Sequence, residues 1–191
     1  MLEDLITSKT RVKILNCFLK NLGEMFHVRE LVRRVDEEIN AVRRELLILE
    51  KRGILKKEPR ANRVYYYLDK SYIYYYDLVS LYAKSHGLGE DIIKNRVKIG
   101  KIKYAMLSGK FARHAEVGAE NVDLLVVGTV VLPELSIFVK AEEELRGREI
   151  NYTVMTEEEF NFRKKRIDPF IGSILLSSRI MLIGDEESMV S

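Results

Sequence analysis

The chain has 191 residues, of which 47% are hydrophobic and 32% are charged, and its net charge is +3. This length allows one large core or two smaller ones, and the net charge is too small to indicate nucleic-acid binding by itself. The single cysteine, Cys17, excludes an intrachain disulfide and a cysteine-rich zinc site, and no stretch is apolar enough to predict an export signal or a membrane span, so we expect a cytoplasmic protein.

The basic residues are concentrated in the N-terminal third. Residues 1–69 contain 15 lysines and arginines against 11 acidic residues, whereas the rest of the chain is close to neutral. Ser8 is a predicted N-cap, and apolar residues at helical spacing predict a helix over residues 9–21 that ends before Gly23. Cys17 lies among the apolar side chains of this helix, which indicates a core residue rather than a reactive thiol.

Two further helices are predicted next. The first covers residues 28–35 and the second covers residues 39–52, with a short break over residues 36–38 between them. Gly53 is the predicted C-terminal stop of the second helix. Two helices joined by a tight turn are the pattern of a helix-turn-helix.

A β-hairpin and a tyrosine-rich helix follow. Residues 54–56 and 64–68 are predicted strands, joined by a turn over residues 59–62. Eight of the ten tyrosines lie between Tyr65 and Tyr82, in the second strand and in a helix predicted over residues 71–84. Three of them are consecutive, and this favours packing, including packing at a subunit interface, over a platform for stacked bases.

The rest of the chain is predicted to form a second domain. Residues 85–90 are short, polar and glycine-containing, which indicates a domain boundary, and a helix over residues 91–97 follows. The sequence then predicts both strands and helices: strands at 103–107, 122–127, 150–155 and 180–183, and helices at 132–145, 157–166 and 169–176. We therefore expect an α/β or α+β chain with one domain over residues 1–69, a connecting helix and linker over residues 70–90, and a second domain over residues 91–191.

The first domain resembles an ArsR-type winged helix-turn-helix. The resemblance rests on the segments Val28–Val35, Asn40–Leu46 and Leu49–Leu55, which match in helix length, turn and wing without gaps. One departure is Asp36, where a glycine is usual. Because aspartate tolerates the left-handed conformation, we expect the turn to be retained.

This resemblance implies that the second helix enters the major groove of duplex DNA. Asn40, Arg43 and Arg44 then face the bases, since asparagine suits adenine and arginine suits guanine. Lys51, Arg60 and Arg63 are placed to contact phosphates from the helix end and the wing. The competing interpretation is that these charges only solvate an exposed helix, with Arg43 or Arg44 paired to glutamates on neighbouring turns. Regulators of this kind usually bind as dimers, so we expect a homodimer.

The second domain resembles the minimal nucleotidyltransferases in its Ser108–Arg113 and Asn121–Gly128 segments. That family holds two divalent metals on clustered carboxylates, and its Gly-Ser turn contacts the nucleotide phosphates. The resemblance implies nucleotide contacts for four residues of this chain: Ser108, Gly109, Lys110 and Arg113. Here the turn is inverted to Ser108-Gly109, Asn121 replaces the first acid, and Asp123 is the one acid clearly retained.

A third acid is expected from the next strand. The matching position holds Asn151, with Glu149 as a substitute on the same face and Glu120 as a further candidate. Because one carboxylate cannot hold two metals, we expect no metal site and a domain used for sensing, dimerisation or binding a partner protein. Two alternatives stay open: an active enzyme that uses Asp123 with Glu149, Mg²⁺ and a nucleoside triphosphate, and an antitoxin-like module that neutralises a partner protein.

Overall fold

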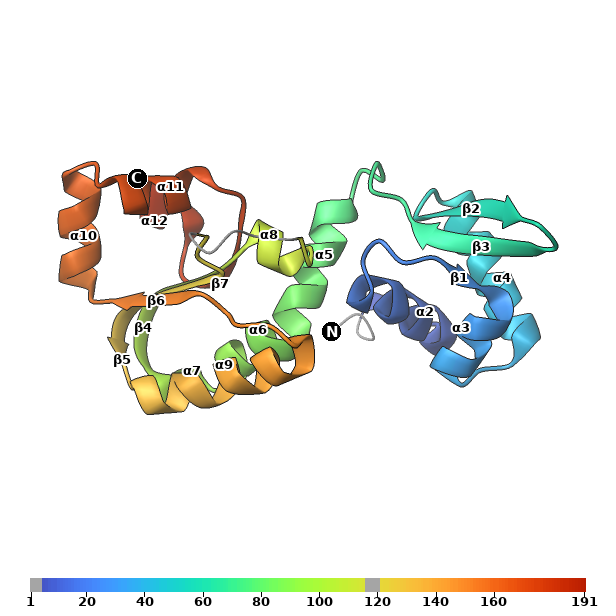
Figure 1. Cartoon of the computed structure of the whole chain (residues 1–191), viewed down its shortest axis with the longest axis horizontal. Helices are drawn as coiled ribbons and strands as arrows, with labels where there is room; N and C mark the ends of the chain where they lie inside the picture. Colours follow the sequence, from blue (N-terminus) through green and yellow to red (C-terminus); the bar gives the residue numbers. More distant parts are fainter. Residues whose placement is uncertain (1–4, 116–120) are drawn as a thin grey trace. The chain divides into compact units, whose positions relative to one another are not determined.

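The structure is a computed structural model and describes residues 5–115 and 121–191. The chain divides into two compact units, Met1–Tyr82 and Ala83–Ser191, each built from helices and a β-sheet (Figure 1). The chain is therefore of the α+β type that its sequence predicts. Within the described residues, no helix combines the length and the apolar character needed to span a bilayer.

Three helices form the body of the first unit: α2 (Lys9–Lys20), α3 (Val28–Val35) and α4 (Ile39–Lys51). The hydroxyl of Ser8 caps α2 by accepting a hydrogen bond from the backbone N–H of Arg11 at 3.3 Å. The helices bury apolar side chains at helical spacing, which is why this part of the sequence folds as predicted; they include Ile14, Leu15, Phe18, Leu31, Val42, Leu46 and Leu49.

The turns at both ends of α4 have left-handed residues. Asp36, between α3 and α4, has φ 49° and ψ 61°, so the expectation that aspartate retains this turn is confirmed. Gly53, after α4, has φ 74°, a conformation that glycine adopts without steric cost. The backbone N–H of Ile54 donates to the carbonyl of Leu49 at 3.0 Å and closes the helix end.

A three-stranded antiparallel sheet completes the first unit, in the order β1–β3–β2, from β1 (Phe26–His27), β2 (Leu55–Arg60) and β3 (Arg63–Leu68). The hairpin is longer than predicted, because the expected turn over residues 59–62 shrinks to Ala61 and Asn62. Pro59 lies inside β2 and pairs with Val64. Since β2 is an edge strand, proline removes no hydrogen bond from the ladder there.

Helix α5 (Tyr75–Ser85) carries the chain from the first unit into the second, and α6 (Gly87–Lys94) follows after one residue. The prediction of a linker over residues 85–90 is therefore wrong. Its glycines serve close packing, because a Cβ on Gly89 would lie 2.0 Å from the carbonyl oxygen of Ala83. Leu88 is fully buried in the core of the second unit. Among the tyrosines, Tyr75 is buried, whereas Tyr74 and Tyr76 are exposed.

A four-stranded sheet with the order β6–β5–β4–β7 forms the centre of the second unit. Only the pairing of β5 with β6 is parallel. The strands are β4 (Gly100–Ser108), β5 (Leu124–Val130), β6 (Tyr152–Met155) and β7 (Arg179–Ile183). The helices after α6 are α7 (Arg96–Ile99), α8 (Gly109–Ala112), α9 (Leu132–Arg146), α10 (Glu157–Lys165), α11 (Pro169–Leu176) and α12 (Glu186–Val190).

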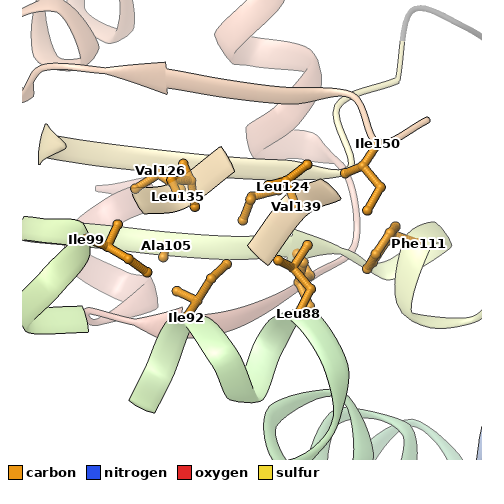
Figure 2. Close-up of a cluster of buried hydrophobic side chains, with 11 residues drawn as sticks. Leu88, Ile92, Ile99, Ala105, Phe111, Leu124, Val126, Leu135, Val139 and Ile150 are labelled. Carbon is orange, nitrogen blue, oxygen red and sulfur yellow. The ribbon is translucent and has the colours of Figure 1, made fainter. Parts of the chain in front are cut away.

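Both faces of this sheet are covered by helices, as Figure 1 shows. On one face, Ala105, Leu124 and Val126 pack against side chains of α6, α7 and α9, including Leu88 and Leu135 (Figure 2). On the other face, alternate residues of the same strands pack against α10, α11 and α12: Tyr104, Met106, Leu125 and Val127. Burial on both faces explains why residues 104–107 of β4 and 124–127 of β5 are continuously apolar instead of alternating.

Candidate nucleic-acid interface

The exposed face of α4 carries the residues that the sequence predicts to read DNA. Val42 and Leu46 are fully buried and fix the orientation of the helix. Asn40, Arg43 and Arg44 consequently point away from the core and are all exposed. The three lie within two turns of the helix start, so they form one polar surface.

Four acidic residues on or near α4 are paired with other cations, whereas Asp36 and Glu38, which precede the helix, have no ion-pair partner among the described residues. The four ion pairs, of 2.7 to 3.0 Å, are Arg11–Glu45, Lys13–Glu37, Lys57–Glu50 and Arg34–Glu30. Hydrogen bonds from Lys13 and Thr10 lower the pKa of Glu37 and keep it ionised. Across residues 5–115 and 121–191, no carboxylate forms an ion pair with Arg43 or Arg44. Within the part of the chain that the structure describes, Arg43 and Arg44 therefore lack the glutamate partners that they would have as ordinary paired surface charges.

The remaining predicted phosphate contacts differ from one another. Lys51 ends α4 and is exposed. Arg63 begins β3 and is exposed, without an ion-pair partner in the described residues. Arg60 is also exposed, but its Nε lies 2.7 Å from a carboxylate oxygen of Glu58 on the same strand. Its charge is therefore partly neutralised, which separates it from Arg63.

A groove of about 440 Å³ lies between α3, the first residue of α4 and strand β3. Arg29, Arg33 and Arg63 line it together with His27, and Val32 and Ile39 provide apolar surface. The sequence predicted a role for Arg63 and missed Arg29 and Arg33. Their spacing of four residues, which places two arginines on one side of α3, is the signal that could have found them.

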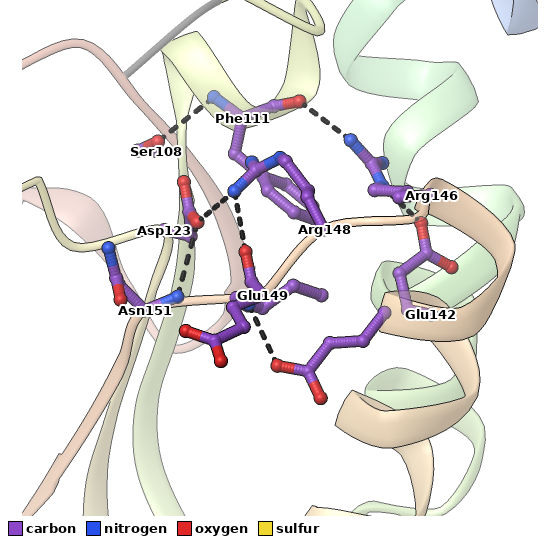
Figure 3. Close-up of polar contacts among 10 residues, drawn as sticks. Ser108, Phe111, Asp123, Glu142, Arg146, Arg148, Glu149 and Asn151 are labelled. Carbon is purple, nitrogen blue, oxygen red and sulfur yellow. Dashed lines mark hydrogen bonds and ion pairs between the residues drawn. The ribbon is translucent and has the colours of Figure 1, made fainter. Parts of the chain in front are cut away.

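In the second unit, Asp123 lies immediately before β5 and its side chain is completely buried. One carboxylate oxygen accepts a hydrogen bond from the guanidinium of Arg148 at 2.9 Å and another from the backbone N–H of Asn151 at 3.2 Å (Figure 3). The backbone carbonyl of Asp123 accepts from the N–H of Ser108. Nothing in the local sequence pattern indicated Arg148 as the partner of this acid.

This arrangement does not fit two divalent metals. The positive charge beside Asp123 is supplied by Arg148, and the second carboxylate oxygen, Oδ1, is buried without a hydrogen-bond partner among the described residues. Glu149 is exposed, and it is its backbone carbonyl that accepts from Arg148, at 2.8 Å. The described residues contain no group of three His, Cys, Asp or Glu side chains that could hold a metal. Glu120, the further candidate, lies outside the described residues.

The predicted phosphate-binding turn is occupied by internal hydrogen bonds. The hydroxyl of Ser108 caps α8 by accepting from the N–H of Phe111 at 3.0 Å. The N–H of Gly109 donates to the carbonyl of Ser178 at 2.7 Å. The two cations of the turn also have partners, since Lys110 donates to the side chain of Asn121 and Arg113 donates to the hydroxyl of Ser178. These contacts stabilise the turn itself.

A second arginine reinforces the same corner of the fold. Arg146 forms an ion pair of 2.6 Å with Glu142 and donates to the carbonyl of Phe111, and its guanidinium lies 3.8 Å from the centre of the Phe111 ring. Glu142 is buried and accepts from the backbone N–H of Leu88 at the start of α6. The polar residues that surround Asp123 therefore hold α6, α8 and α9 together.

Comparisons with protein-family models, with curated proteins and with solved structures found nothing that matches this chain.

Proposed function

We propose that this protein is a DNA-binding transcriptional regulator whose first unit is a winged helix-turn-helix. In this proposal α3 and α4 are the two helices of the motif, α4 enters the major groove, and the β2–β3 hairpin is the wing. Asn40, Arg43 and Arg44 read base edges, while Lys51 and Arg63 neutralise phosphates.

One observation carries the proposal: Arg43 and Arg44 stand exposed on α4 without an ion-pair partner among the described residues, while Glu37, Glu45 and Glu50 are paired with other cations. On a surface whose charges served only to keep the protein soluble, we would expect acidic and basic side chains to be paired with one another. The cations that remain in excess on this surface match the high negative charge density of duplex DNA.

The second unit has, in our proposal, the outline of a nucleotidyltransferase without its two-metal chemistry. The buried ion pair of Asp123 with Arg148 supports this, because it uses the retained acid as a structural group. A role in sensing a signal, in dimerisation or in binding a partner protein is left for this unit. Dimerisation would place two copies of α4 on paired half-sites.

Selection from a random duplex library with the purified full chain tests the proposal. We expect an enriched sequence with two-fold symmetry, whose half-sites are about 10 base pairs apart, one helical turn, or a multiple of that distance. Enrichment of a single asymmetric half-site would support DNA binding and contradict the proposed dimer. Failure to enrich any sequence, together with no gel retardation at low salt, would remove the regulatory function.

A further inference from the structure

We propose that the groove lined by Arg29, Arg33 and Arg63 binds a phosphate of the DNA backbone. The inference rests on the proposed function, since the duplex supplies the phosphate. It adds to that function a defined anion site formed by α3 and the wing, in which Arg29 and Arg33, which the sequence alone did not single out, join Arg63.

The groove brings together charges from distant parts of the chain. Arg29 and Arg33 lie on α3, and Arg63 begins β3, thirty residues beyond Arg33. Pairing of β1 with β3 places the wing strand beside the start of α3, because His27 pairs with Tyr65. The three guanidinium groups are thus carried by two elements that the sheet fixes relative to each other.

These arginines have no ion-pair partner among the described residues, and their neighbour Arg34 is the contrast. Arg34 lies 3.0 Å from the carboxylate of Glu30, and its guanidinium is 4.5 Å from the centre of the buried Phe26 ring. One helix therefore carries an internally neutralised arginine next to arginines that line an open groove. An anion in the groove would provide the missing counter-charge.

The chemistry of the groove suits a phosphate oxyanion. Guanidinium groups donate paired hydrogen bonds to phosphate oxygens, and the apolar side chains of Val32 and Ile39 reduce the solvation that would weaken them. His27 adds a donor, because its Nδ1 accepts from the N–H of Glu30 at 3.3 Å, which leaves the ring proton on Nε2. Among the described residues, no acidic side chain lines the groove.

A duplex and free inorganic phosphate both offer this chemistry, and we assign the groove to the duplex. The reason is position: Ile39 in the groove wall is the first residue of α4, and Asn40, a proposed base contact, follows it directly. A backbone phosphate held here would fix the register of α4 on the bases.

The test compares adjacent arginines in the full-length protein. Arg33→Gln and Arg34→Gln remove the same charge from neighbouring positions, and binding of each variant to a mixed-sequence duplex is measured by fluorescence anisotropy across a series of NaCl concentrations. We expect Arg33→Gln to flatten the slope of log affinity against log salt by about 0.9, the change for one lost phosphate contact, and Arg34→Gln to leave the slope unchanged. Arg33→Lys, which keeps the charge, should retain the slope.

Each outcome decides between the two proposals. Equal slopes for Arg33→Gln and Arg34→Gln, with the duplex still bound, would overturn the groove and leave the proposed function standing. No binding by the unaltered protein would overturn both. Release of the duplex by inorganic phosphate at constant ionic strength, from the unaltered protein and not from Arg33→Gln, would show that the free anion is the ligand. Lys13→Gln replaces Arg34→Gln as the control if circular dichroism shows that the latter unfolds.

Discussion

The guanidinium of Arg148 lies 2.9 Å from the carboxylate of Asp123, the one acid of the nucleotidyltransferase pattern that this sequence clearly retains. The Asp123 side chain is completely buried, whereas about a third of the Arg148 side chain is exposed. The pair therefore joins the inside of the sheet to the surface after α9. Its environment gives Asp123 a structural role.

Replacing Arg148 with alanine should destabilise the second unit. The substitution leaves a buried carboxylate without its counter-charge, and we expect the free energy of unfolding in urea to fall by about 3 kcal/mol. Because Arg148 is partly exposed, water screens part of the charge, and the expected loss lies at the low end of the range for broken buried ion pairs. Lys165→Ala, at an exposed position of α10, is the control and should stay within about 0.5 kcal/mol of the unaltered protein. Equal stability of the two variants would contradict the structural role of the pair.

Mg²⁺ should not stabilise the protein. Because Asp123 is buried against Arg148, we expect the same melting temperature in MgCl₂ as in NaCl of equal ionic strength, with and without a nucleoside triphosphate. Asp123→Asn is the paired variant, since it keeps the backbone hydrogen bond from Asn151 and removes the charge. A rise in melting temperature with Mg²⁺ that Asp123→Asn abolishes would restore the enzymatic alternative.

Removing both exposed arginines of α4 should weaken duplex binding. For Arg43→Gln with Arg44→Gln, we expect affinity for the selected site to fall and discrimination against other sequences to fall with it, since each bidentate contact with a base contributes about 1–3 kcal/mol. Lys13→Gln is the matched control, because Lys13 is exposed but paired with Glu37. The measurement is a competition titration of selected against scrambled duplex. Unchanged discrimination would mean that α4 does not read bases.

Cys17 should react slowly with iodoacetamide in the folded protein. Burial raises the pKa of its thiol above the ordinary value, so the reactive thiolate is scarcer than in the unfolded chain at the same pH. Because the folded-state pKa is the higher one, the related stability is present below the unfolded pKa and is lost as pH rises through the folded pKa. Alkylation followed by mass spectrometry, in buffer and in urea, checks the rate. Equal rates would place the thiol at an open position.

The local structure of residues 9–53 could be predicted because its signals are short-range. Apolar spacing within each helix, the cap at Ser8 and the stop at Gly53 all act over a few residues, and each appears where expected. The hairpin was harder, because Pro59 indicates a turn unless the strand is known to be an edge. Which strand is an edge depends on the pairing of β1 with β3, far along the chain.

The sequence alone determined which residues face outward on α4, because helical periodicity decides this within two turns. Only the tertiary structure decided which charges stay available. Glu45 pairs with Arg11, 34 residues away in the sequence, and Asp123 pairs with Arg148, 25 residues away. Neither helical nor strand periodicity predicts such partners. Coulombic attraction acts through space, so the folded arrangement of the backbone, and not the order of residues, leaves Arg43 and Arg44 unpaired within the described residues and holds Asp123 in the interior.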